Sequence, residues 1–418
     1  MLSEEQIELI TERLISRIEK ANTYFLKELG EKIKKIKKLT PSQADKLIQI
    51  LKYGGTYEEI EKKLQKYTGL NIKDIDDILS NYAKTDLRFY EKFYKYKHIP
   101  VTQIYENKAI LGQIQAISNI VKNKMYDFSR PKVIGYTINK QFYNLRDAYN
   151  EVLNTALINV SQGKETFDTA MSSIIKDIGG SGLKTINYES GRAVRLDSAI
   201  RMHLQDGLRQ IHNSNQQIAG EEFGYNGVEV THHLNSAPDH IDTVDGKQFA
   251  LIDKIREQIN NGLEKEIKQS DIVGDVVYVK GKRYEDFNAV NNSLLRKVST
   301  LNCQHTIFPI IVGVSQPEYT EEQLKRDKEL NEKGFEFEGK HYTMYEGEQK
   351  QRQIEREIRK QKDIQMFARS SGQELEAQKA QLRINVLGIK YKELSDVSGL
   401  KTRNERLKVS GFRNIKTK

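Results

Sequence analysis

Cysteine, proline and tryptophan are scarce in this chain: its 418 residues include one cysteine, six prolines and no tryptophan. A single cysteine cannot form an intrachain disulfide, and residues 1–5 lack the basic and apolar segments of a signal peptide. We therefore expect the protein to fold in a reducing cytosol. The few prolines and the many Lys, Glu, Gln, Ile and Leu residues favour long helices.

Long apolar segments are also missing. The longest notable run, residues 307–314, is far shorter than the ~18 residues that cross a bilayer, and Pro309 interrupts it. We therefore expect no membrane-spanning segment. Hydrophobic residues make up 37% of the chain and charged residues 30%, a lower apolar share than in an ordinary compact enzyme. This composition predicts an extended, helix-rich protein with modest cores.

Basic residues outnumber acidic ones and give the chain a net charge of +9. This charge would attract polyanions such as nucleic acid, although a lysine-rich composition also keeps helical proteins soluble. Residues 388–418 hold nine basic and three acidic residues, a net charge of +6. Glycines in this segment predict a loose tail that either lies along the phosphates of double-stranded DNA, without reading bases, or is simply solvated. The candidate DNA contacts are Lys401, Arg403, Arg406, Lys408 and Arg413.

Residues 1–180 are predicted to form the first of three regions, built from consecutive helices. Apolar side chains at three- and four-residue steps mark an amphipathic helix over residues 7–25. Thr40 and Gln43 are expected to cap the next helix. Residues 179–182 are interpreted as a glycine-rich linker, because the Lys-Ser or Lys-Thr pair of a phosphate loop does not follow them. Further helices are expected at residues 104–125, 139–160 and 167–178.

Residues 181–345 are predicted to form a small α+β core around a long helix from Leu196 to Ala219. Residues 228–234 alternate like a half-buried strand, and residues 247–251 return beside them after the turn signal Asp245-Gly246. Two more hairpins are expected at residues 275–284 and 335–342. The predicted fold is mainly α with a small α+β core. It combines long helices and helical hairpins with short antiparallel β-hairpins docked on the long central helix.

Residues 346–418 form the third predicted region, a charged helix followed by the basic tail. The helix is expected at residues 346–367, where Ile354, Ile358 and Met366 are too few apolar residues for a core of its own. We therefore expect this helix to need a neighbour.

Two short clusters collect the only cysteine and three of the eight histidines. One cluster covers residues 233–240 and the other residues 302–305, in a region whose strand-like alternation would let them meet. Cys303 and His305 stand two residues apart, so on a strand they would point to one face. The candidate site residues are His233, Ser236, Pro238, His240, Cys303 and His305.

Three interpretations of this cluster remain open. His233, His240, Cys303 and His305 offer the nitrogen and sulfur ligands of a structural CysHis3 zinc site. Alternatively, nearby Asp or Asn side chains satisfy the imidazoles and give a hydrogen-bonded histidine cluster without metal. In the third interpretation a histidine activates the Cys303 thiolate for catalysis, but no oxyanion-hole or substrate pattern accompanies it. We expect no cofactor from the sequence, with a structural zinc ion as the alternative.

Several separated blocks between residues 182 and 362 match one protein family when they are taken in order. These blocks are Gly182-Leu183-x-x-Ile186-x-Tyr188-x-Ser190-Gly191-Arg192, Arg195-x-Asp197-Ser198-Ala199-x-Arg201, His233-x-x-Ser236-Ala237-Pro238-x-His240, Asp245-Gly246-Lys247, Asn302-Cys303-x-His305, Phe308-Pro309, Gly313-Val314-Ser315 and a tail from Tyr342 to Arg359. The set resembles the minor capsid protein 2 family of tailed bacteriophages and prophages, relatives of the head-morphogenesis proteins grouped as MuF.

The resemblance implies a low-copy structural component of the phage head, which associates with the portal vertex and assembles with portal and scaffold proteins before DNA packaging. It implies a place inside the virion beside packaged DNA, after assembly in the cytoplasm of the bacterial host, and no catalytic role. Because their apolar stripes are narrow, we expect the N-terminal helices and the 346–367 helix to dock on portal or other head proteins.

Two other functions compete with this one. The first is a zinc-stabilised nucleic-acid-binding protein or nuclease, which the net charge and the His/Cys clusters favour. The second is a toxin carrier, since some MuF relatives are fused to effector domains. Residues 363–418 are too short and too charged to resemble such a domain.

Overall fold

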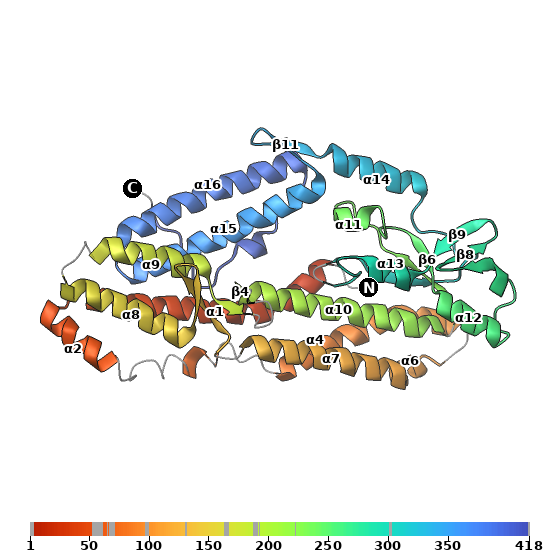
Figure 1. Ribbon diagram of the computed structural model, residues 1–418, viewed down its shortest axis with the longest axis horizontal. Helices are drawn as coiled ribbons and strands as arrows, with labels where there is room; N and C mark the ends of the chain where they lie inside the picture. Colours follow the sequence, from red (N-terminus) through yellow and green to blue (C-terminus); the bar gives the residue numbers. More distant parts are fainter. Residues whose placement is uncertain are drawn as a thin grey trace. The chain divides into compact units, whose positions relative to one another are not determined.

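The chain has the mainly helical fold with small antiparallel sheets that its sequence predicts (Figure 1). Its contacts divide it into two compact units: unit 1 contains residues 1–10, 73–122 and 202–348, and unit 2 contains residues 11–72, 123–201 and 349–418. Each unit draws on more than one of the three predicted regions, and that three-region division stays a prediction. The computed structural model describes residues 4–51, 62–64, 66, 72–96, 100–129, 132–162, 167–186, 191, 193–221, 223–300 and 303–416.

Unit 2 is built mainly from long helices. The predicted N-terminal helix is α1, and its apolar side chains Ile15, Ile18 and Phe25 are buried. The predicted cap of the next helix is confirmed, because the Thr40 hydroxyl accepts from the Gln43 amide while the Gln43 side chain accepts from the Thr40 amide. The helices are α1 (Glu4–Ile36), α2 (Pro41–Leu51), α8 (Leu145–Gln162), α9 (Phe167–Ser181), α15 (Met344–Ser370) and α16 (Glu374–Ser398).

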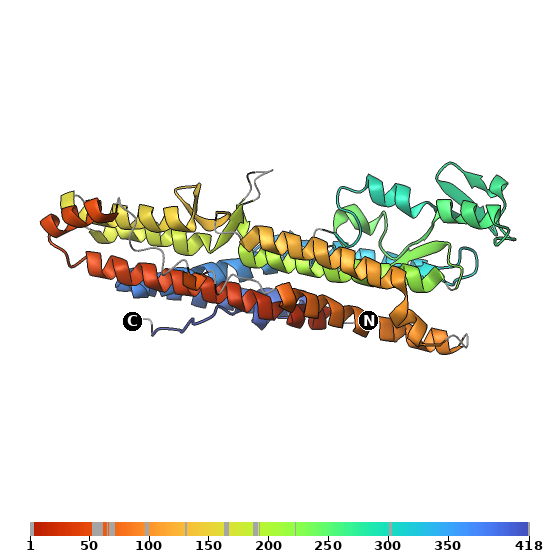
Figure 2. The ribbon, with the colours of Figure 1, turned by 90° about the horizontal axis from the view of Figure 1, so that it is seen from below.

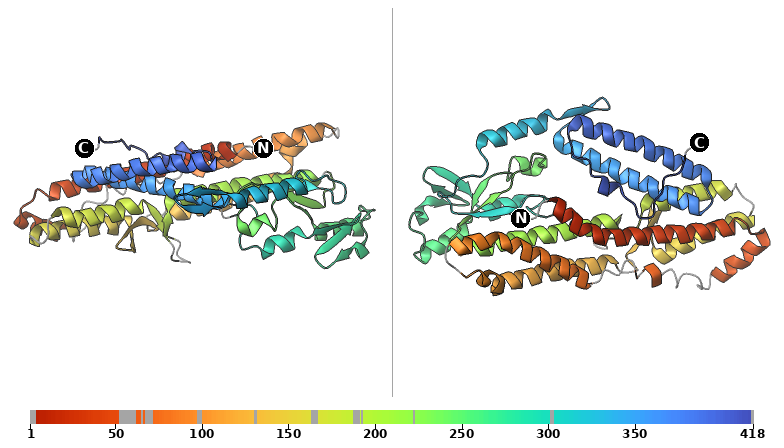
Figure 3. Two further views of the ribbon diagram at one scale, coloured as in Figure 1. Left: turned by 90° about the horizontal axis from the view of Figure 1, so that it is seen from above. Right: turned by 180° about the vertical axis from the view of Figure 1, so that it is seen from behind.

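The charged helix predicted at residues 346–367 is α15, and its own chain supplies the neighbour that it needs. Ile354, Ile358 and Phe367 are buried, and α1 runs beside α15 in the right-hand view of Figure 3. At their contact a Cβ on Gly30 would lie 1.9 Å from Ser370 Oγ, so only glycine fits there. Because the apolar faces of α1 and α15 are buried within unit 2, their narrow stripes no longer indicate docking on another protein.

A four-stranded antiparallel sheet in unit 2 corrects the prediction that the first region is purely helical. Its strand order is β2-β1-β3-β4. The turn between β1 and β2 places Asn139 and Lys140 at φ 48° and 67°, the left-handed values of a tight hairpin. The helix predicted at 139–160 therefore begins only at Leu145. The strands are β1 (Ile134–Ile138), β2 (Gln141–Asn144), β3 (Lys184–Ile186) and β4 (Ala193–Arg195).

The glycines interpreted as a linker are the last turn of α9, so that interpretation is wrong. The helix continues through Gly179 to Ser181, and Gly182 follows at φ +61°, the left-handed conformation common after a helix. A Cβ on Gly179 would lie 2.8 Å from the Ile364 Cα atom. Gly179 therefore serves close packing of α9 on α15 rather than flexibility.

The basic C-terminal segment is not the loose tail that its glycines predicted. Gly388 lies inside α16, and residues 399–416 pack on unit 2. Thr23 donates to the Ser410 carbonyl at 2.7 Å, and Gln365 donates to the Arg413 carbonyl at 3.0 Å. The short 3-10 helix η3 (Asn404–Leu407) belongs to this segment.

Unit 1 is organised around the long helix α10 (Leu196–Glu221), which confirms the helix predicted from Leu196 to Ala219. Figure 2 shows α7 running along it, and a Cβ on Gly207 would lie 2.4 Å from the Val121 side chain. No helix among the described residues is long and apolar enough to span a membrane. The other helices mainly in this unit are α4 (Ile72–Leu87), η1 (Arg88–Tyr90), α5 (Glu91–Tyr96), α6 (Thr102–Glu106), α7 (Lys108–Ser129), α11 (Pro238–Ile241), α12 (Ile252–Asn260), η2 (Gln269–Asp271), α13 (Phe287–Ser293) and α14 (Glu321–Lys333).

Three small antiparallel sheets complete the described part of unit 1. The hairpins predicted at residues 275–284 and 335–342 are confirmed as β8–β9 and β11–β12. The sheet with order β10-β5-β6 docks on α10, where Asn213 Oδ1 accepts from the Ile307 amide at 3.2 Å. Val228, Val230 and Phe249 are buried in its core. The strands are β5 (Gly227–Val230), β6 (Gln248–Ala250), β7 (Ile272–Val273), β8 (Val276–Val279), β9 (Lys282–Glu285), β10 (Ile307–Ile310), β11 (Phe335–Phe337) and β12 (Lys340–Tyr342).

Candidate metal centre

The pairing of β5 with β10 brings the two His/Cys clusters together at one end of the sheet. Val230, the last residue of β5, pairs with Ile307, the first residue of β10. The strand predicted to reach Leu234 therefore ends earlier, and Cys303 and His305 precede β10 rather than lie on it. The histidines and the cysteine project from the loops beyond these strand ends. Asn302, the first residue of the second cluster, lies outside the described residues.

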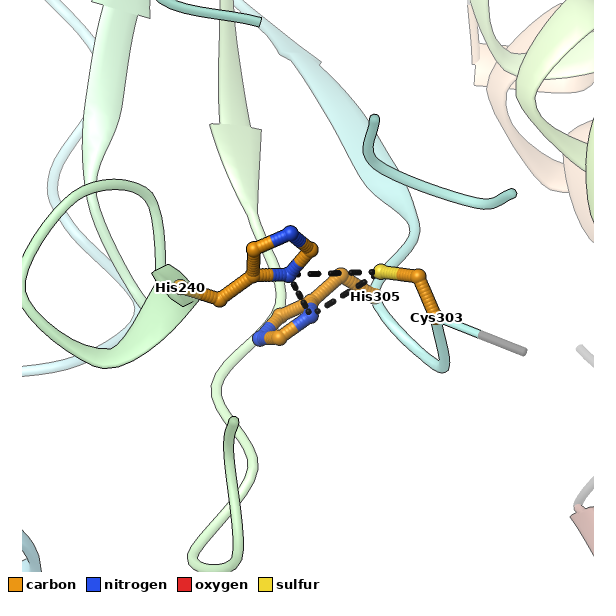
Figure 4. A group of neighbouring side chains, drawn as sticks. All are labelled: His240, Cys303 and His305. Atoms are coloured by element: carbon orange, nitrogen blue, oxygen red, sulfur yellow. Dashed lines mark hydrogen bonds between the residues drawn. The ribbon is translucent and has the colours of Figure 1, made fainter. Parts of the chain in front are cut away.

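His240, Cys303 and His305 converge in a buried group, which we call the HCH trio (Figure 4). The two imidazole Nδ1 atoms are 3.2 Å apart. The Cys303 Sγ atom lies 3.5 Å from Nδ1 of His240 and 3.3 Å from Nδ1 of His305. Each of these residues is at most 3% exposed. Three possible metal ligands thus face one another out of reach of bulk solvent.

The outer ring nitrogens of the HCH trio are held by hydrogen-bond acceptors. Nε2 of His240 lies 2.6 Å from the Arg296 carbonyl oxygen, and Nε2 of His305 lies 2.8 Å from Asp245 Oδ1. A carbonyl oxygen cannot donate, and neither can an ionised carboxylate, so both Nε2 atoms carry the proton. In neutral rings each Nδ1 then presents a lone pair toward Cys303.

Asp245, which its Asp-Gly sequence predicted only as a turn residue, organises the polar groups around the HCH trio. Besides His305, it accepts from the Ser236 hydroxyl at 2.6 Å, from Nδ1 of His232 at 2.6 Å and from the His233 amide at 2.9 Å. Burial opposes its ionisation, but hydrogen bonds from His232, His305 and Ser236 outweigh this and hold the pKa of Asp245 well below its usual range.

The other candidate residues support the site from outside the trio. The ring of His233 packs edge-on against His305, but its nitrogens are not among the ligand atoms that converge: its Nε2 is 3.3 Å from the Thr231 hydroxyl. Burial and the neighbouring His305 lower the pKa of His233 to about 4. Pro238 occupies the first position of α11 and so helps to start the turn that carries His240.

Electrostatics within the cluster favour a separated charge pair when no cation is bound. Burial opposes ionisation of the Cys303 thiol, but hydrogen bonds from His240 and His305 outweigh it and lower its pKa to about 5. Burial likewise opposes protonation of His305, but Asp245 and Cys303 raise its pKa to about 9. A thiolate beside an imidazolium is nucleophilic in principle. Cys303 is only 3% exposed, however, which favours a structural role over a catalytic one.

The candidate DNA contacts belong to unit 2, whereas the HCH trio belongs to unit 1. Lys401, Lys408 and Arg413 are exposed. Arg403 and Arg406 are partly buried, and Arg406 lies 4.0 Å from the buried Glu355 carboxylate. The exposed three are therefore better placed to meet a polyanion than the other two.

A further buried polar cluster lies in unit 2, on residues for which the sequence predicted no role. Arg195 lies 3.2 Å from Asp197 Oδ1 and 3.5 Å from Asp363 Oδ2. Arg359 pairs with the other oxygen of Asp197. These four residues, together with Glu19, are called the arginine–aspartate network below. The sequence features that could have indicated this network are the Arg-x-Asp spacing at the start of α10 and the arginine on α15.

The carboxyl groups of this network fall into two classes by the direction of their pKa shifts. Burial raises the pKa of Asp363 to about 6. Burial and the nearby negative charges of Asp197 and Glu12 raise the pKa of Glu19 to about 7. Burial acts on Asp197 in the same direction, but Arg195 and Arg359 outweigh it and hold the pKa of Asp197 well below its usual range.

Comparison with known proteins places both clusters in a family context. A search of curated proteins and a search of solved structures found no match. The model of the family described as phage minor capsid protein 2 matches residues 2–394, nearly the whole chain and both buried clusters. The chain therefore belongs to the phage minor capsid protein 2 family.

Proposed function

We propose that this structural phage protein acts inside the head, associated with the portal vertex and close to packaged DNA. It assembles in the bacterial cytoplasm with portal and scaffold proteins before the DNA enters. The family match over residues 2–394 carries the proposal, because it assigns a structural role in a phage particle to almost the whole chain. The net charge of +9 is consistent with a location beside a polyanion.

Association with the portal is tested on the full chain. Deleting residues 1–30 or 346–418 is not a clean test, because these segments supply buried core residues such as Phe25 and Phe367. The tagged chain is instead coexpressed with the portal protein of the same genome, with the major capsid protein as the control partner. We expect it to copurify and coelute with the portal ring and not with the control. Separate elution of chain and portal would reject the portal contact.

Proximity to DNA is supported by the exposed cations of the C-terminal segment, to which Lys416 also belongs. We expect weak, sequence-independent binding of duplex DNA at low salt, because contacts to phosphates carry no base information. The test variant replaces Lys401, Lys408, Arg413 and Lys416 with Gln. Each phosphate contact contributes about 0.9 to the slope of log affinity against log salt, so the slope should fall by up to about 4.

A second variant with the same loss of charge serves as the control for DNA binding. It replaces Lys265, Lys268, Lys282 and Arg283, which are exposed residues of unit 1, with Gln. Affinity and salt slope, measured by fluorescence anisotropy, should stay close to those of the unaltered chain. An equal loss in both variants would mean that total charge, not the C-terminal segment, determines binding.

We further propose that the chain has no catalytic function. The alternative, a zinc-stabilised nuclease, draws on the HCH trio, but the burial of Cys303 and His240 favours a structural role for these side chains. Incubation with supercoiled plasmid and either Mg²⁺ or Zn²⁺ should leave the DNA intact. Cleavage that disappears in a Cys303→Ser variant would support the nuclease instead.

A further inference from the structure

The HCH trio presents more lone pairs than its own protons can satisfy. The Nε2 protons of His240 and His305 are used by the Arg296 carbonyl and the Asp245 carboxylate. Cys303 Sγ and the two Nδ1 atoms lie within 3.5 Å of one another and share one further proton, which is either on the thiol or, in the charge pair, on His305. One proton cannot satisfy the sulfur and both Nδ1 atoms. Buried acceptors facing one another without a proton between them are destabilising. A cation at the centre of the trio would satisfy all three ligands at once.

The spacing of the three ligand atoms fits a tetrahedral zinc ion. Zn–N bonds of about 2.05 Å and a Zn–S bond of about 2.3 Å place two nitrogens about 3.3 Å apart, and nitrogen and sulfur about 3.6 Å apart, on a tetrahedron. The corresponding distances here are 3.2 Å between the Nδ1 atoms and 3.3 and 3.5 Å from Cys303 to the two histidines. The trio thus forms one face of the tetrahedron that zinc prefers.

The surroundings of the trio are also those of a metal centre. Histidine ligands in proteins usually donate their second ring proton to a carboxylate or a carbonyl, which fixes the tautomer and the ring orientation. His305 donates to Asp245 in this way and His240 to the Arg296 carbonyl. Asp245 is held in turn by the Ser236 hydroxyl. The donor set of one thiolate and two imidazoles selects zinc over the oxygen-seeking cations Mg²⁺ and Ca²⁺.

We propose that His240, Cys303 and His305 bind one zinc ion, with a water molecule as the fourth ligand and His233 outside the coordination sphere. The ion ties α11 to the loop that leads into β10, two segments 63 residues apart between His240 and Cys303. It therefore stabilises the β10-β5-β6 end of unit 1. This inference is independent of the portal contact, since it concerns one unit of the isolated chain.

Metal binding is measured on the full chain after treatment with chelator and reductant, followed by titration with Zn²⁺ and gel filtration. Elemental analysis should find about one equivalent of zinc per chain. With Co²⁺ as the probe, a sulfur-to-cobalt charge-transfer band should accompany tetrahedral d–d bands. Less than about a tenth of an equivalent of zinc in natively folded chain would overturn the proposal and leave a hydrogen-bonded histidine cluster.

Variants locate the bound metal. Cys303→Ser should lose the charge-transfer band and most of the zinc, and His305→Ala should lose the zinc. The neighbouring His233→Ala and the exposed His341→Ala should keep about one equivalent. Equal loss in His233→Ala would overturn the assignment of three protein ligands, and full retention in Cys303→Ser would overturn the site.

The unaltered chain provides a test that does not depend on the folding of variants. A zinc-bound thiolate reacts slowly with alkylating reagents, so iodoacetamide labelling of Cys303 should be slow in the zinc-loaded chain and faster after chelation. Mass spectrometry of the peptide that contains Cys303 gives the rate. The same rate with and without zinc, in chain that keeps its native circular dichroism spectrum, would contradict the proposal.

Discussion

Two of the buried polar clusters, one in each unit, balance their charges in different ways. In the arginine–aspartate network of unit 2, Arg195 and Arg359 face Asp197 and Asp363, so the chain itself supplies the counterions. In the HCH trio of unit 1, three electron-pair donors face one another, and the proposed counterion comes from solution as a metal. The first cluster therefore contains ions of both signs from the chain itself, whereas the second, in our proposal, gains its cation only when zinc binds.

Removing the arginine at the centre of the network should have the largest effect. Arg195→Met leaves Asp197 and Asp363 buried with one fewer cation, and an uncompensated buried charge typically costs about 3–5 kcal/mol. Urea unfolding followed by circular dichroism measures the loss. Hydrogen exchange read by mass spectrometry should place the loss of protection in the peptides of unit 2.

An exposed ion pair of the same unit provides the matched control. Lys37 pairs with Asp168, and their side chains are 40% and 53% exposed. Lys37→Met should therefore cost at most about 1 kcal/mol. If Arg195→Met were no more destabilising than Lys37→Met, the network would not be the self-sufficient cluster described for unit 2.

Removing the carboxylate that supports the HCH trio should have the next largest effect. Asp245→Asn weakens the hydrogen bonds from His232, His305 and Ser236, and hydrogen bonds to a charged group contribute about 1.5–3 kcal/mol each, so a net loss of about 2–3 kcal/mol is expected. Zinc affinity should fall by roughly 10–100-fold, as for other residues that orient metal ligands. Thermal unfolding and zinc titration measure the two effects.

Asp242→Asn is the control for this second variant, because Asp242 lies in the same loop but its side chain is 65% exposed, in an ion pair with Lys328. It should change stability by no more than about 0.5 kcal/mol and leave zinc affinity unchanged. A stability loss in Asp245→Asn without any loss of zinc affinity would separate Asp245 from the metal centre.

The sequence predicted the elements whose signal is local. The helix α10 has apolar residues at helical spacing, and Thr40 with Gln43 gave a complete capping pair. The sheet of unit 2 escaped prediction because β1 is buried along nearly its whole length and so does not alternate, and because its hairpin turns at Asn139-Lys140 without a glycine. The linker prediction at Gly179 and Gly180 was wrong for another reason. These glycines allow α9 to approach α15, which begins 163 residues after α9 ends, so no sequence pattern near the glycines indicates the contact.

The candidate site likewise has features that the sequence predicted and features that depend on the tertiary fold. The presence of His240, Cys303 and His305 in two short clusters was enough to expect that they meet. The exclusion of His233 was not predictable, because it depends on where β5 ends and on the Thr231 hydroxyl beside its ring. Asp245 looked like a turn residue, since a carboxylate before glycine is common in turns. Its hydrogen bonds to His305 and His232 depend on the tertiary fold.

The last and smallest effect is a dependence of unit 2 on pH. Burial and neighbouring carboxylates raise the pKa of Glu19 to about 7 from its ordinary value of 4.5. The folded state then binds this proton more tightly than the unfolded state, so the contribution of Glu19 to stability falls as pH rises from about 4.5 to about 7. Asp363, with its pKa raised to about 6, acts in the same direction.

Glu19→Gln removes the charge while keeping the shape of the side chain, so it should stabilise unit 2 by about 1–3 kcal/mol at pH 8 and by much less at pH 4.5. Glu31→Gln, at an exposed position of the same helix, should change stability by less than about 0.5 kcal/mol at both pH values. Urea unfolding at the two pH values measures both variants. A Glu19→Gln variant that is destabilised at pH 8 would mean that the network needs the Glu19 charge as a counterion for Arg359. In that case the charges of Arg195, Arg359, Asp197 and Asp363 would not balance by themselves, and the network would need the Glu19 carboxylate as a further anion.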